Sequence, residues 1–171
     1  RELGLTWLRS ELQKINGLKV SDTDIETIYD EQGGAPYSVL DSLIARSNKD
    51  DKDELTISIQ AARYLLQSMS QGARINWLDA AEKTHKAQYS YLLAAMQRWT
   101  SDLQAVSQGG NARYYPKHLS TLKGLSDTTQ TTKLHHFWKS LIQARRHENH
   151  PLANRVQLEA LLSQYQQVFE S

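Results

Sequence analysis

The feature that most constrains this chain is a long amphipathic run between residues 89 and 106. Its apolar side chains recur every three or four residues, and they are Tyr89, Leu92, Leu93, Met96, Trp99, Leu103 and Val106. This spacing keeps one face of a helix apolar for about five turns, and Gly109-Gly110 then ends the run. A face of that length has to be buried against other helices, so the run predicts the centre of a helical bundle.

Shorter runs with the same spacing predict helices along the rest of the chain. They cover residues 3–12, 22–32, 36–44, 55–69, 74–82, 134–146 and 156–168. Ser21 suits the start of the second helix and Pro36 the start of the third. We interpret residues 109–129 as a long connection that includes a short helix at 117–122. Only three prolines and eight glycines occur in 171 residues, and we therefore predict an all-α fold.

A polar run divides the predicted helices into two groups. Residues 47–53, with the sequence Ser-Asn-Lys-Asp-Asp-Lys-Asp, contain no apolar side chain, and we interpret them as a linker. The predicted organisation is a unit of three short helices over residues 1–46 and a bundle of five to six helices over residues 54–171. Residues 1–53 carry 7 Lys and Arg against 11 Asp and Glu, whereas residues 54–171 carry 13 against 8. We therefore expect the two parts to face different surroundings.

The sequence lacks the motifs that carry common enzyme chemistry. No glycine-rich loop followed by Lys and Ser or Thr could bind phosphates, and no Gly-X-Ser-X-Gly turn presents a nucleophile. The chain has no cysteine, and its six histidines form no recognisable set of metal ligands. We therefore expect no enzyme activity, no metal and no other cofactor. No run approaches the roughly 18 apolar residues of a membrane span, so we expect a cytoplasmic protein with no membrane contact.

The glycine pair Gly33-Gly34 opens a segment with a recognisable pattern. Gly34, Ala35, Pro36 and Leu40 resemble the Gly-small-X-Arg-X-X-Leu start of the last lid helix in clamp-loader subunits of the AAA+ class. The arginine of that pattern lies over the phosphates of a bound nucleotide, but this chain has Tyr37 at the position. A phenol cannot supply a permanent, forked cation. The resemblance therefore implies a lid that does not sense ATP, and we expect Tyr37 to pack instead.

Three further segments resemble the delta-prime type of subunit in the bacterial DNA polymerase III clamp loader. They are residues 5–9, 91–103 and 154–162. In such subunits a motor domain that resembles a nucleotide-binding domain precedes the lid, and a helical collar follows it. The resemblance implies that this chain, which opens on Arg1 rather than on methionine, is the lid and collar of a longer protein. The motor domain, with the zinc-binding cysteines of the family, would lie upstream.

The resemblance also implies partners. In that family the collar joins five subunits into a ring that places the sliding clamp on primed DNA, so we expect contacts with ATPase subunits of the gamma and tau type and with the delta subunit. The predicted interface residues lie on apolar helix faces or at helix ends, and they are Arg98, Trp99, Leu103, Trp138, Arg145, Arg146, Leu161 and Tyr165. The alternative is a helical module that binds nucleic acid or regulates another protein. The basic residues form no cluster, which disfavours it.

Overall fold

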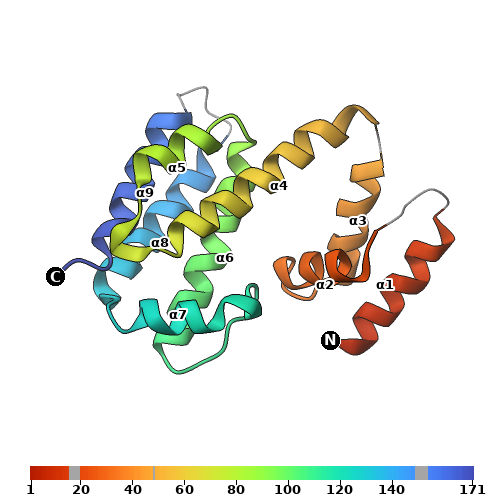
Figure 1. Cartoon of the computed structure of the whole chain (residues 1–171), viewed down its shortest axis with the longest axis horizontal. Coiled ribbons are helices and arrows are strands. Elements are labelled where there is room, and N and C mark those ends of the chain that lie inside the picture. The colour runs from red at the N-terminus through yellow and green to blue at the C-terminus, as the bar shows by residue number, and fades with distance from the viewer. Residues whose placement is uncertain (16–19, 48, 149–153) are drawn as a thin grey trace.

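The computed structural model describes residues 1–171 except 16–19, 48 and 149–153. Helices make up 77% of the chain, and the described residues contain no strand. The prediction of an all-α fold is therefore confirmed. Figure 1 shows two groups of helices, α1 to α3 and α4 to α9, which we call the N-terminal unit and the C-terminal unit.

The N-terminal unit consists of α1 (Glu2–Lys14), α2 (Asp22–Glu31) and α3 (Pro36–Ser47). The side chain of Ser21 accepts a hydrogen bond from the backbone N–H of Asp24 at 3.2 Å, as expected of an N-cap. α3 packs against both α1 and α2. The small core between the three helices consists of Leu5, Leu8, Leu12, Ile25, Ile28, Tyr29, Val39 and Leu43.

The predicted linker is largely helical in the structure. α4 (Lys49–Met69) begins inside it, whereas Ser47 belongs to α3 and residue 48 lies outside the described residues. The segment is therefore helical rather than irregular, and its role as a linker between the two groups of helices stays a prediction. A run without apolar residues predicts exposure to water, but it does not exclude a helix when it lacks glycine and proline.

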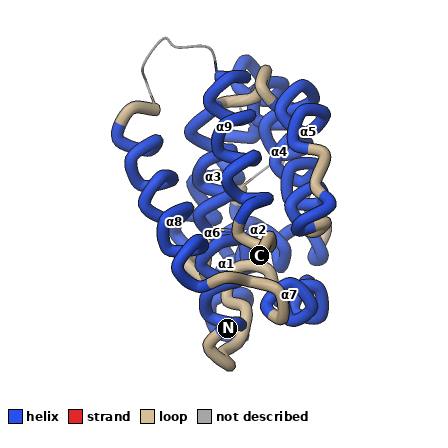
Figure 2. The backbone as a smooth tube through the Cα atoms, turned by 90° about the vertical axis from the view of Figure 1, so that its left-hand side faces the viewer, coloured by secondary structure: helices blue, strands red, loops and turns tan. Residues whose placement is uncertain are grey.

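The C-terminal unit is a bundle around α6 (Tyr89–Ser107), which packs against α4, α7 and α8. The other helices are α5 (Trp77–Thr84), α7 (Leu119–Ser126), α8 (Thr131–Arg146) and α9 (Asn154–Gln167). Two short 3-10 helices, η1 (Gly72–Arg74) and η2 (Pro116–His118), lie between them. Figure 2 shows the chain after a quarter turn, from the side on which α5 and α9 lie, and these two helices pack against each other.

Buried hydrogen bonds join three helices of this bundle. The indole N–H of Trp99 donates to the hydroxyl of Tyr165 at 3.0 Å, and that hydroxyl donates to the carbonyl of Met69 at 2.8 Å. Burial raises the pKa of Tyr165 above its usual value. The phenol therefore stays protonated and can donate, so α4, α6 and α9 are held in one register.

Two local expectations for the C-terminal unit need correction. Residues 109–129 contain a full helix, α7, and its Leu122 is completely buried, so the segment is more than a connection. The predicted short helix at 117–122 overlaps the observed α7, which starts two residues and ends four residues further along. In α9, Val156 is 63% exposed, and the buried face of this helix starts only at Leu158.

Candidate site where the two units meet

The turn at Gly33-Gly34 is one of the places where the N-terminal unit touches the C-terminal unit. Both glycines have positive φ angles, 65° and 78°, which other residues rarely adopt. A Cβ atom on Gly33 would also lie 2.7 Å from Cε1 of Tyr114, closer than atoms can approach without displacement. The turn therefore requires glycine at position 33 for its backbone conformation and for its neighbour in the other unit.

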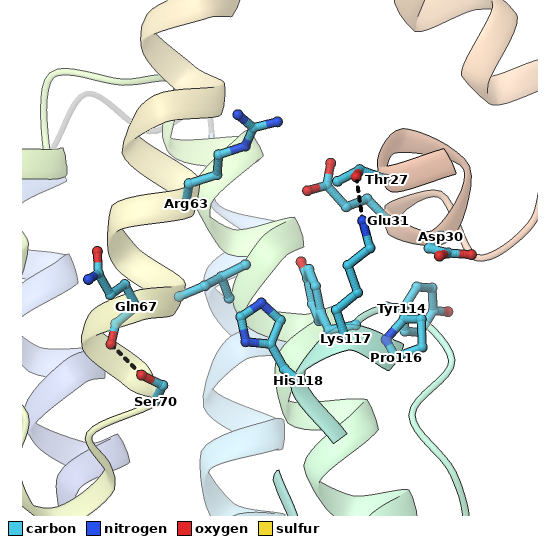
Figure 3. Close-up of a pocket in the computed structure, with 12 residues that line it drawn as sticks. Thr27, Asp30, Glu31, Arg63, Gln67, Ser70, Tyr114, Pro116, Lys117 and His118 are labelled. Atoms are coloured by element: carbon cyan, nitrogen blue, oxygen red, sulfur yellow. Dashed lines mark hydrogen bonds between the residues drawn. The ribbon is translucent and has the colours of Figure 1, made fainter. Parts of the chain in front are cut away.

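Two cations of the C-terminal unit bind polar groups of this region. The guanidinium of Arg113 donates from Nε and Nη2 to the carbonyl oxygen of Gly33, at 3.3 and 3.0 Å. Lys117 donates from Nζ to the hydroxyl of Thr27 at 3.2 Å, as Figure 3 shows. Both cations belong to the segment between α6 and α7. The two hydrophobic cores are separate clusters, so polar contacts dominate this junction.

A buried carboxylate holds the segment that carries these contacts. Asp102 on α6 is 1% exposed, and it accepts the backbone N–H groups of Arg113, Tyr114 and Tyr115 at 2.8, 2.9 and 2.7 Å. Burial raises the pKa of the Asp102 carboxyl, and the three N–H groups act in the opposite direction. The position of Arg113 and Tyr114 is therefore set by α6, the most buried helix of the bundle.

A cavity of about 440 Å³ lies beside these contacts (Figure 3). Asp30 and Glu31 line it from the N-terminal unit, and Arg63, Lys117 and His118 line it from the C-terminal unit. Asp30 forms an ion pair with Arg1 at 2.6 Å. Acidic side chains of the N-terminal unit and basic side chains of the C-terminal unit thus line the same cavity.

The groups in the cavity engage one another and the surrounding helices. The hydroxyl of Ser70 donates to the carbonyl of Gln67 at 2.6 Å, and the ring of His118 lies edge-on to Trp99 with 5.7 Å between centroids. The remaining wall is mostly apolar, with Leu66 and Tyr115. This arrangement offers charge and hydrogen bonding for recognition. Among the described residues, no group of three or more His, Asp or Glu side chains is placed to hold a metal ion.

Tyr37 lies on the outside of the N-terminal unit, in the first turn of α3. It is 71% exposed, and its ring lies 4.9 Å from the ring of Trp7 between centroids. The expected packing of Tyr37 is therefore present on one side only. Of the rest of the motif, Gly34, Ala35 and Pro36 form the turn and the helix start, and Leu40 packs against the small core.

The predicted interface residues fall into two classes. Trp99, Leu103 and Tyr165 are completely buried and Leu161 is nearly so, all within the core of the C-terminal unit. Their prediction as interface residues was wrong, because an amphipathic pattern cannot tell whether a helix face is covered by its own bundle or by a partner. The other four are at least partly exposed. Arg98, Trp138 and Arg145 line one hollow between α6 and α8, and Arg146 lies outside it.

Sequence reasoning missed the residues that join the two units, namely Asp102, Arg113, Tyr114 and Lys117. The sequence contained one indication of these contacts. Asp102 lies between Trp99 and Leu103 on the buried face of α6, and a charge at such a position needs hydrogen-bond donors nearby. The donors are backbone groups eleven to thirteen residues further along, and the sequence does not show where such a segment returns.

Comparisons with known proteins gave no identification. No protein family, no curated protein and no solved structure was found to match this chain. Within the described residues, no helix is long and apolar enough to cross a membrane.

Proposed function

We propose that this chain is the non-catalytic lid and collar of a clamp-loader subunit of the delta-prime type, acting in the bacterial cytoplasm. The N-terminal unit would be the lid and the C-terminal unit the collar. Its partners would be the ATPase subunits of the loader and the delta subunit. The sliding clamp and primed DNA would be reached through the whole complex.

The observation that carries this proposal is the junction at Gly33. A lid that responds to ATP has to move relative to the collar, whereas here the motif segment is hydrogen-bonded to the C-terminal unit. The carbonyl of Gly33 accepts from Arg113 at 3.0 Å, and the acceptor Asp102 fixes the segment behind it. Tyr37, at the position of the sensing arginine, offers no cation. Both features fit a subunit that keeps a fixed shape while its neighbours use ATP.

The proposal is tested by assembly. We would mix the purified chain with the ATPase and delta subunits of a bacterial clamp loader and measure the mass of the eluted species by size-exclusion chromatography with light scattering. A stable complex that contains this chain is expected, because collar helices associate by burying surface on neighbouring subunits. Elution of the chain as a separate species in every combination would contradict the proposal.

Two binding measurements test the alternatives. Direct binding of the isolated chain to primed DNA, weakening steeply with added salt, would favour a nucleic-acid module instead. Measurable binding of ATP to the wild-type chain would contradict a lid that has lost its sensing role. For the same reason we expect Tyr37→Arg to leave the chain unable to bind ATP, since one arginine does not create the missing phosphate loop.

A further inference from the structure

A second hollow, of about 270 Å³, lies between α6 and α8. Ala94, Arg98 and Ser101 line it from one face of α6, since residues three, four and seven apart share a helix face. Trp138 and Arg145, seven residues apart on α8, line the opposite side. The small side chains of α6 leave the space, and its walls are formed by the two arginines and the tryptophan together with Gln97 and Tyr114.

Two arginines, Arg98 and Arg145, line the hollow, and Arg145 is paired with Glu148 outside it. No Asp or Glu is among the described residues that line it, and α8 carries no acidic residue from Thr131 to Arg146. Arg145 is positioned by its own helix bundle, because Nη1 donates to the carbonyl of Ser90 at 3.2 Å and Nε lies 3.3 Å from Glu148. Among the described residues, none forms a hydrogen bond or ion pair with the guanidinium of Arg98.

We propose that this hollow receives the carboxylate of an Asp or Glu side chain from a helix of a neighbouring subunit. The inference rests on the proposed function and names the chemistry of one of its contacts. A guanidinium binds a carboxylate through two parallel hydrogen bonds, and arginine and tryptophan are the residues that most often anchor protein interfaces. A nucleic-acid backbone would instead need a row of cations spaced along a path. Here two arginines line one concave site and Arg145 is held by Ser90 and Glu148, so Arg98 is the guanidinium that would bind a single carboxylate.

The main test is a charge reversal, Arg98→Glu, with affinity for the ATPase and delta subunits of a bacterial clamp loader as the readout. A partner carboxylate would then meet another carboxylate, so we expect Kd to rise at least about 30-fold. Lys123→Glu is the matched control, because Lys123 is exposed on α7 and lies outside the hollow. It changes the net charge equally and should leave Kd nearly unchanged. Circular dichroism checks that both variants fold.

A second measurement does not depend on a charge change. The chain has no cysteine, so Ser101→Cys places a single thiol in the hollow, to which a photo-crosslinker can be attached. In the assembled complex we expect crosslinks to a partner helix that carries Asp or Glu within reach, identified by mass spectrometry. Crosslinks only to segments without an acidic residue would overturn the inference.

The outcomes separate this inference from the proposed function. If the wild type assembles and Arg98→Glu assembles equally well, the hollow is not the contact and only the further inference is wrong. If the wild type joins no subunit, the proposed function fails and the inference fails with it. Loss of binding to primed DNA, with assembly unchanged, would assign the hollow to a phosphate. Loss of a dimer of this chain alone would assign it to a second copy. Either result would overturn the proposal that the hollow receives a carboxylate from a neighbouring subunit.

Discussion

The two units of this chain are held together in different ways. In the N-terminal unit, ion pairs cross between helices: Arg1 binds Asp30, and Arg9 binds both Asp22 and Glu26. In the C-terminal unit, the ion pairs among the described residues join positions three or four apart on one helix or at its end. That unit instead has a large core crossed by buried hydrogen bonds.

This difference indicates which of the two units contributes more to the stability of the chain. Exposed ion pairs each contribute only about 0–1 kcal/mol, whereas the burial of one large apolar side chain contributes about 1.5–3 kcal/mol. The small N-terminal core therefore cannot hold three helices firmly without help, and the contacts at Gly33 supply some of that help. We expect the N-terminal unit to open first and the C-terminal unit to set the global stability.

The largest expected effect separates the two cores. Leu103→Ala and Leu8→Ala each truncate a completely buried leucine, one in each unit. We expect Leu103→Ala to lower the global free energy of unfolding by about 2–5 kcal/mol. Leu8→Ala should leave that value nearly unchanged and accelerate amide exchange only in α1 to α3, because that unit opens separately. Urea unfolding and hydrogen exchange by mass spectrometry measure both quantities.

The comparison of the two cores would be contradicted if both variants lowered the global free energy of unfolding equally. Equal loss of global stability in Leu8→Ala and Leu103→Ala would mean that the units unfold as one, so the junction would be far stronger than its polar contacts suggest.

The next effect is expected at Asp102, which links the bundle to the junction. Asp102→Asn replaces a carboxylate that accepts three backbone N–H groups with an amide that has one acceptor oxygen. We expect a loss of about 2–3 kcal/mol from the buried donors left without a partner. The change lies in the C-terminal unit, yet amide exchange should also rise at the end of α2, because Arg113 and Tyr114 lose their support.

Asp127→Asn is the control for this variant, since Asp127 is exposed in the same unit. It should change neither the stability nor the exchange at α2. Protection of α2 unaltered in Asp102→Asn would show that Asp102 serves its own unit alone.

The same comparison explains what the sequence could predict. The apolar stripes of α6 and α8 have regular spacing, so the helices and the all-α class were predictable. The short-range signals at Ser21 and Pro36 also gave correct helix starts. The junction depends on pairs of residues 80 and 90 positions apart, Arg113 with Gly33 and Lys117 with Thr27. No periodicity records such pairs, and polar residues in a connecting segment look alike whether they bind another unit or water.

A smaller effect is expected for Gly33→Ala. The substitution places a Cβ atom against Tyr114 and forces alanine into a left-handed conformation, which costs about 1–2 kcal/mol. We expect faster exchange in α2 and α3, with the global stability of the C-terminal unit maintained. Gly124→Ala is the matched control, because its new Cβ would meet no atom within 4 Å and it lies in α7. That control should stabilise the chain by about 0.5–1 kcal/mol. A similar gain in Gly33→Ala would refute the tight approach.

The smallest effect is expected for Arg113→Gln, which shortens the donor that reaches Gly33 and removes its charge. The contact is exposed, so its loss should cost about 0.5–1 kcal/mol of local stability in the N-terminal unit. Added salt screens charges between the acidic and the basic unit. Raising the salt concentration should therefore speed exchange at α2 in the wild type more than in Arg113→Gln. Arg74→Gln, an exposed change in η1 away from the junction, should keep the salt response of the wild type. If wild type and Arg113→Gln respond equally to salt, the shape of Gly33 and Tyr114, rather than charge, holds the units together.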